Sequence, residues 1–185
     1  NLASGTINGG TITAAPATTS QLVASSGTSV LNGVTLDADL TLNTNTTVSV
    51  TGGLNLATGR TLALNDNSND GIFNTVLSFS GSQTLSGGGA VVFGGGNFIG
   101  NAVRPAAAGQ TLTIGSGITI ETGVGQGTVG LSGATVNNQG LIRVDTAGQS
   151  ITLAGSFNNL AGAPGGVVQV TNGTLTLNGA WTNAN

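Results

Sequence analysis

The feature that most constrains the fold is a unit that runs twice between residues 136 and 183 and then begins a third time. Its mark is Val-Asn-Asn at 136–138, which recurs as Phe-Asn-Asn at 157–159 and as Trp-Thr-Asn at 181–183. Between the marks, two alternating apolar segments and a glycine turn recur in the same order. A fixed period of about 20 to 50 residues indicates a repeat fold, in which stacked units share one continuous core.

Residues 34–64 show how each unit is built. Five triplets there alternate apolar and other residues: Val-Thr-Leu at 34–36, Leu-Thr-Leu at 40–42, Val-Ser-Val at 48–50, Leu-Asn-Leu at 54–56 and Leu-Ala-Leu at 62–64. Such alternation is typical of a strand with one buried face. A shorter and a longer spacing alternate between the starts of the triplets, so three strands complete one turn of about 20 residues. The spacing predicts an all-β solenoid with three strands per coil.

The predicted organisation is one β-solenoid domain over residues 1–185, with about six to seven coils of about 20 to 24 residues. Residues 1–33 are expected to form an irregular first coil, and residues 34–64 regular coils. Residues 65–110 are expected to form irregular coils with loops, and residues 111–185 regular coils with an open C-terminal end. A β-sandwich is disfavoured, because its long cross-connections do not produce this self-similarity.

The composition supports strands and turns, and it removes several classes of partner. Hydrophobic residues make up 38% of the chain and glycine accounts for 33 residues, while aromatic residues are only 3%. The chain has six acidic residues and only three basic ones, so there is no basic cluster to bind nucleic acid or an anionic membrane surface. No apolar run approaches the ~18 residues of a membrane span. The absence of cysteine excludes a disulfide framework and thiolate metal sites.

The repeated unit predicts two columns of side chains, one polar and one apolar. Asn138, Asn159 and Asn183 are expected to form a ladder of amide hydrogen bonds between coils. The large apolar residues two positions earlier are expected to stack in the core: Val136, Phe157 and Trp181. We expect Trp181 to lie at an open face that is continued by further repeats or by the next subunit.

One segment carries the oxygen pattern of a calcium loop. Asp66, Ser68 and Asp70 alternate before Gly71, and calcium prefers such oxygen ligands. The twelfth position of the loop is Leu77, where an EF-hand has an acidic residue. A solvated turn between strands has the same composition, so both interpretations stay open. Calcium is the one candidate cofactor.

Paired carboxylates raise the question of catalysis. Asp37 and Asp39 share one face of a corner, as two carboxylates of a glycoside hydrolase would. Histidine, lysine and tyrosine are absent, and the other charged residues are scattered along the chain. Arg143 and Asp145 have the spacing of a surface ion pair. The sequence therefore predicts that the protein is not an enzyme.

Threonines on the predicted outer faces suggest a second kind of function. Pairs such as 111/113 and 174/176 place two hydroxyls on one side of a strand, and stacked coils align them. Flat ranks of threonine resemble the ice-binding face of some β-solenoid antifreeze proteins. Threonine is also simply a favourable residue for an exposed strand. Asn55, Ala63 and Gly130 interrupt other outward positions, which favours that simpler interpretation.

The segments Gly-Ser-Phe-Asn-Asn at 155–159, Gly-Val-Val-Gln-Val at 166–170 and Asn-Gly-Thr-Leu-Thr-Leu at 172–177 support a family resemblance. Together they resemble the right-handed parallel β-helix repeats of large bacterial surface proteins: filamentous-haemagglutinin-like adhesins, autotransporter passenger domains and giant β-strand-repeat proteins. The resemblance implies a right-handed coil and an extracellular location on the bacterial cell surface.

For function, the resemblance implies a structural role as a segment or subunit of a fibre or adhesin shaft. The expected partner is the protein itself, in a head-to-tail homopolymer or through neighbouring repeats, because the two ends of a solenoid are open sheet edges. The alternative is a ligand-binding module whose outer face holds a glycan, calcium or ice. Neither nucleic acid nor a membrane is an expected partner.

Overall fold

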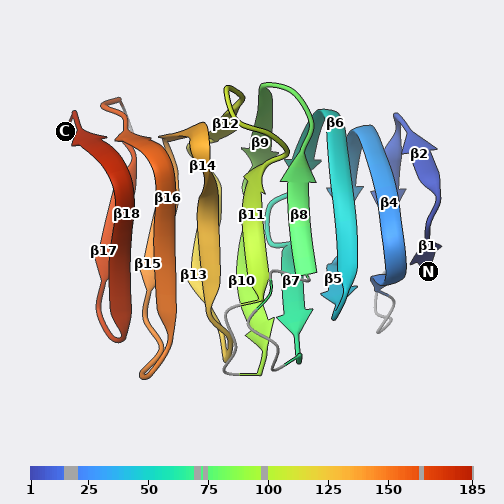
Figure 1. Ribbon diagram of the computed structural model, residues 1–185. Coiled ribbons are helices and arrows are strands. Elements are labelled where there is room, and N and C mark those ends of the chain that lie inside the picture. Colours follow the sequence, from blue (N-terminus) through green and yellow to red (C-terminus); the bar gives the residue numbers. More distant parts are fainter. Residues whose placement is uncertain (15–20, 69–71, 73–74, 97–99, 163–164, 185) are drawn as a thin grey trace.

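The computed structural model describes residues 1–14, 21–68, 72, 75–96, 100–162 and 165–184. In these ranges the chain forms 18 β-strands and no helix, and every strand pairing is parallel. The strands lie side by side in one elongated stack that runs from the N-terminus to the C-terminus (Figure 1). This arrangement confirms the all-β prediction and is consistent with a β-solenoid. A membrane-spanning helix is likewise not found in the described ranges.

The strand pairings define three ladders along the stack. The first ladder joins β1 (Leu2–Ala3), the start of β4 (Leu22–Asp37), β5 (Leu40–Asn43), β7 (Thr61–Asp66), β10 (Ala90–Gly95), β13 (Thr119–Thr122), β15 (Leu141–Val144) and β17 (Val167–Val170). Its strands pair in sequence order, so each level of the stack contacts only the level before it and the level after it. This neighbour-only arrangement is typical of repeat proteins.

The other two ladders share several long strands. The second joins β2 (Thr6–Asn8), the middle of β4, the start of β6 (Thr46–Leu56), β8 (Thr75–Phe79), β11 (Asn101–Pro105), and the first parts of β14 (Gly127–Asn138), β16 (Ser150–Asn159) and β18 (Thr174–Asn183). The third joins β3 (Thr11–Thr13), the ends of β4 and β6, β9 (Gln83–Gly87), β12 (Thr111–Ile114), and the last parts of β14, β16 and β18.

Each ladder therefore has eight levels in the described part of the chain, against the six to seven coils expected. The step between levels also varies more than the sequence pattern indicated. Leu22 pairs with Leu40, whereas Leu62 pairs with Val91, which is a much longer step along the chain. The long step arises because the turns between strands in this region carry extra residues while the strands keep their register.

Glycines allow the long strands to turn between the second and third ladders. Gly155 in β16 has a φ of 81°, and Gly179, its register partner in β18, has a φ of 139°. A Cβ atom at Gly155 would lie 2.6 Å from the Ala134 carbonyl oxygen of the level below. Since L-residues rarely adopt this conformation and the space is filled by backbone, only glycine fits this corner.

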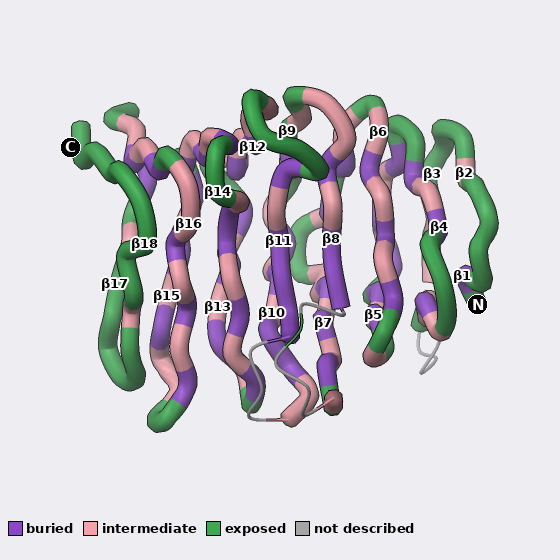
Figure 2. The backbone as a smooth tube through the Cα atoms, in the orientation of Figure 1, coloured by how far each residue is buried: buried purple, intermediate pink, exposed green. Residues whose placement is uncertain are grey.

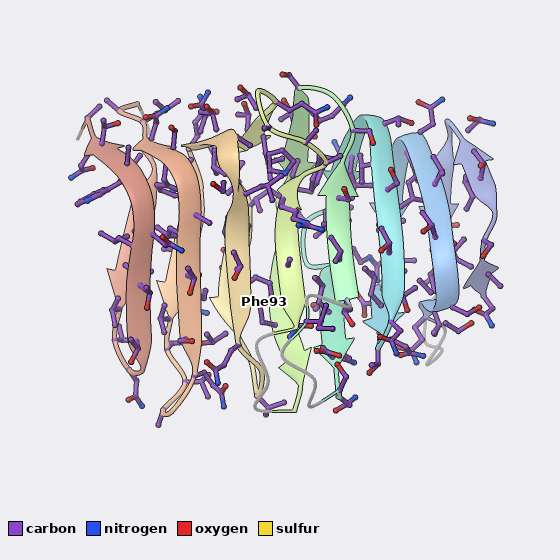
Figure 3. All side chains as sticks on the ribbon, viewed as in Figure 1. Phe93 is labelled. Carbon is purple, nitrogen blue, oxygen red and sulfur yellow. The ribbon has the colours of Figure 1, made fainter. Side chains whose placement is uncertain are left out.

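The core is a set of apolar columns inside the stack. Alternate residues of each strand are buried, so that Leu40, Leu62, Val91, Ile120 and Ile142 follow one another in register and are all buried. Phe93 lies about halfway along the stack and fills the interior there (Figure 3). The interior is covered by neighbouring levels everywhere except at the ends, where the last strands are largely exposed (Figure 2).

Candidate functional sites

The asparagines at 138, 159 and 183 occupy consecutive levels of the third ladder. Asn138 Nδ2 donates a hydrogen bond of 2.9 Å to Asn159 Oδ1, and Asn159 Nδ2 donates one of 3.0 Å to Asn183 Oδ1. Asn138 and Asn159 are buried, whereas Asn183 is exposed on the last level. The amides thus form a hydrogen-bonded ladder parallel to the axis of the stack, which we call the amide ladder.

The amide ladder also holds the turn that leads into the next level. Asn138 Oδ1 accepts from the Gly140 backbone amide at 3.1 Å, and Asn159 Nδ2 donates to the Gly166 carbonyl oxygen at 2.7 Å. In the level below Asn138 the same position is occupied by Ile114, so the column is apolar there. These bonds satisfy the buried amides, and the ladder therefore acts as a structural element of the corner.

The predicted apolar column reaches the end of the stack. Val136 pairs with Phe157, and Phe157 pairs with Trp181. Phe157 is 1% exposed, whereas Trp181 is 49% exposed because, among the described residues, only the level before it pairs with its strand. Leu177 in the same strand is 42% exposed, although its register partner Leu153 is buried. The last level thus presents core residues at an open face.

The structure describes two of the three candidate calcium ligands. Asp66 Oδ1 accepts hydrogen bonds from the Ser68 backbone amide at 3.1 Å and from its hydroxyl at 2.7 Å. Asp66 is fully buried, and its Oδ2 atom has no hydrogen-bond partner among the described residues. Asp70 lies outside the described residues. Within the described ranges no group of three or more acidic, histidine or cysteine side chains could hold a metal ion. Calcium binding here stays a prediction.

Each of the paired carboxylates is held by a structural contact. Asp37 Oδ1 accepts a hydrogen bond of 2.8 Å from Arg60 Nε, and Asp39 Oδ1 accepts one of 2.9 Å from the Thr61 backbone amide. Both partners come from the next level of the stack. The two carboxylates thus secure a corner between levels.

A second charged cluster lies on the first ladder. Glu121 and Arg143 are register partners on β13 and β15, and Arg143 Nη2 donates a hydrogen bond to Glu121 Oε2. Arg143 Nε also lies 3.0 Å from Asp145 Oδ2. The hydrogen bond to Glu121 and the charge of this carboxylate raise the pKa of Arg143, and Asp145 adds to the effect. The Arg143 side chain is 37% exposed, so this cluster contributes modestly to stability.

Threonines align on the outside of the second ladder over three levels. Thr128, Thr152 and Thr176 are register partners on β14, β16 and β18. The level before them has Ala102 in this position, and the one before that has Val76. In the described residues the rank of threonines therefore extends over three levels. Ice binding stays a prediction.

The sequence did not indicate a buried polar corner between the first and second ladders. Thr46 and Thr75 both donate their hydroxyls to the Asn43 carbonyl oxygen. Asn101, the register partner of Thr75, donates to the carbonyl oxygens of Gly94 at 3.0 Å and Gln126 at 2.9 Å. These side chains replace backbone hydrogen bonds where the chain turns. The three corner residues are spaced more widely than the C-terminal repeats, so no pattern marked them.

Comparison of the chain with protein-family models, with curated proteins and with solved structures gives no significant match in any of the three.

Proposed function

We propose that the chain is a structural segment of an extracellular bacterial fibre or adhesin shaft, which is extended by end-to-end stacking of coils. In this proposal the three ladders wind as a right-handed β-helix with three strands per coil. The support is the parallel, level-by-level pairing, together with a composition low in charge and free of cysteine. Its bacterial and extracellular setting rests on the family resemblance of the repeats.

The observation that carries the proposal is the open face of the last level. In the described residues β17 pairs only with β15, and β18 pairs only with β16, so one edge of each strand is free. This face exposes the core residues Trp181 and Leu177. A hollow of about 170 Å³ at this end is lined by both residues and by Asn183. A further coil would cover the hollow and pair both edges.

The opposite end of the stack offers a complementary edge. Within the described ranges β1, β2 and β3 each pair only with β4, so their other edges are free as well. Ile7 and Ile12 are only partly buried there, against the core. Contact between the first level of one copy and the last level of another is heterologous. Such a contact generates filaments when it does not close on itself.

Negative-stain electron microscopy of the purified chain over a range of concentrations tests this proposal. We expect thin filaments at high concentration. Eight levels at ~4.8 Å each give an axial repeat of about 38 Å per subunit. Isolated short rods at every concentration would contradict self-stacking.

A pair of variants separates stacking from general association. Trp181→Lys places a charge on the core side of the open face, and we expect it to abolish filaments. Thr182→Lys introduces the same charge at the neighbouring exposed position, whose hydroxyl donates to Asn158 Oδ1 on the outside of the stack. We expect this control to keep filaments. If both variants formed filaments, or if neither did, the open face of the last level would not be the specific contact between subunits.

A further inference from the structure

A cavity of about 320 Å³ lies on the outer side of the second ladder, against β11, β14 and β16. Its floor consists of two rows of outward positions: Ala102, Thr128 and Thr152 in one row, and Gly130, Ala154 and Asn178 in the other. Glycine and alanine at these positions leave the space that larger side chains would fill. Leu131 and Ser132, which follow Gly130 in a bulge of β14, also line the cavity.

Arg104, which lines this cavity, is a cation without a counter-ion in the described part of the chain. The other two arginines of the sequence, Arg60 and Arg143, are each paired with a carboxylate. The Nε atom of Arg104 is buried and has no hydrogen-bond partner in the ranges that the structure describes. An unpaired guanidinium beside a cavity attracts an anion, so the site favours a ligand that supplies the missing counter-charge. None of the described lining residues is acidic, and an anion therefore meets no repulsion from them.

The remaining polar groups of the cavity suit a hydroxylated ligand. The Ser150 hydroxyl is already bonded to Gln126. The hydroxyls of Thr128 and Thr152 form no side-chain hydrogen bond in the ranges that the structure describes, and neither does the Asn178 amide. These groups can donate to and accept from sugar hydroxyls. The glycine and alanine floor offers apolar contact to the C–H groups of a sugar ring.

From this combination we propose that the cavity binds one acidic pyranose unit, a sugar ring that carries a carboxylate. Arg104 binds the carboxylate through a charge-assisted, forked pair of hydrogen bonds. Thr128, Thr152 and Asn178 bind ring hydroxyls. The volume of about 320 Å³ is at the small end of the range for small-molecule sites, about 300 to 1,000 Å³, which suits a single ring. The site lies on the side of the stack, so it does not depend on end-to-end stacking.

Titration with D-glucuronate, followed by isothermal calorimetry, tests the proposal. We expect saturable binding, with Arg104→Gln weakening it at least about tenfold, the effect of removing a charge-assisted hydrogen-bond pair. Thr152→Val keeps the shape of the side chain but removes its hydroxyl, and a several-fold loss is expected. Arg60→Gln, the same change at an arginine outside the cavity, is the matched control and should bind as the unmodified protein does. Thermal melting verifies that each variant is folded.

Three further probes show whether binding needs the sugar ring, the carboxylate or both. D-Glucose has the ring without the charge, acetate has the charge without the ring, and the dipeptide Ala-Glu carries carboxylates on a peptide. Weaker binding of all three than of glucuronate is the expected result. No binding of glucuronate, or binding unaffected by Arg104→Gln, would overturn the site. Acetate or the dipeptide binding as tightly as glucuronate would overturn the assignment to an acidic sugar.

Discussion

Asn159 shows how a polar side chain is accommodated inside an apolar stack. Its amide group accepts a hydrogen bond from Asn138 and donates to Asn183 and to the Gly166 carbonyl oxygen. Each of these contacts needs the donor and the acceptor on the correct side of the amide. The position therefore requires asparagine, since a carboxylate of the same shape has no donor for the two oxygens that it faces.

Replacement of Asn159 by aspartate tests this requirement. At pH 7 we expect Asn159→Asp to lower the free energy of unfolding by about 2 to 4 kcal/mol, because a buried charge then faces two acceptors. Urea unfolding followed by circular dichroism measures the change. Asn158→Asp, the same substitution at the neighbouring position, loses the hydrogen bond to Asn137. It should cost under about 1 kcal/mol, as its side chain is partly exposed. Equal costs would refute a special role for the amide ladder.

Between strands, packing inside the stack couples a large side chain in one ladder to a glycine in another. Gly127 begins β14, and a Cβ atom added there would lie 2.6 Å from ring carbons of Phe93 in β10. Both residues are buried. The bulk of the phenylalanine ring in the core is therefore accommodated only because the facing strand begins with glycine.

This coupling predicts a non-additive pair of substitutions. Gly127→Ala should destabilise the protein by about 1 to 3 kcal/mol through overpacking against the ring. In the Phe93→Leu background the same change should cost less, with a coupling energy of at least about 0.5 kcal/mol. Urea unfolding of the unmodified protein, the two single variants and the double variant gives the four free energies of this double-mutant cycle. Gly5→Ala, where an added Cβ meets nothing within 4 Å, serves as a control and should change stability by under about 0.5 kcal/mol. Strict additivity would refute the contact.

The sequence carries the strand pattern and the C-terminal columns, because both depend on short, regular spacings. Alternation marks the strands, and spacings of 21 and 24 residues separate Asn138, Asn159 and Asn183. Contacts in the middle of the stack depend on turns of unequal length. Glu121 contacts Arg143 after 22 residues, but the Asp66 backbone amide donates a hydrogen bond to Asn101 Oδ1, 35 residues on. Without a constant period, the position of Arg104 beside a cavity could not be inferred from the sequence.

Across the whole molecule, the number of neighbours varies from the middle to the ends. An inner level such as that of β13 is paired on both sides, by β10 and by β15. The last level is paired on one side in the described residues. In a stack whose levels contact only their neighbours, stability is approximately a sum of the interfaces between levels. The ends should therefore open before the middle.

Hydrogen exchange measured by mass spectrometry tests this gradient. At a concentration where the chain is monomeric, amides of β17 and β18 should exchange at least about tenfold faster than those of β10 and β13, because end levels open locally. Under conditions that give filaments, β17 and β18 should gain protection while β10 and β13 change little. The same rate in every strand would show that the stack opens as one cooperative unit.

The direction of the strand pairing also has a mechanical consequence. The hydrogen bonds of every ladder run along the stack, and the chain ends lie at its opposite ends (Figure 1). A tensile load between the termini therefore pulls these bonds apart one level after another, instead of shearing many at once. Each released level frees roughly 20 to 30 residues, which is a contour length of about 70 to 100 Å at about 3.4 Å per residue. Under tension the molecule would lengthen in steps and dissipate work at each one, as a series of sacrificial links does.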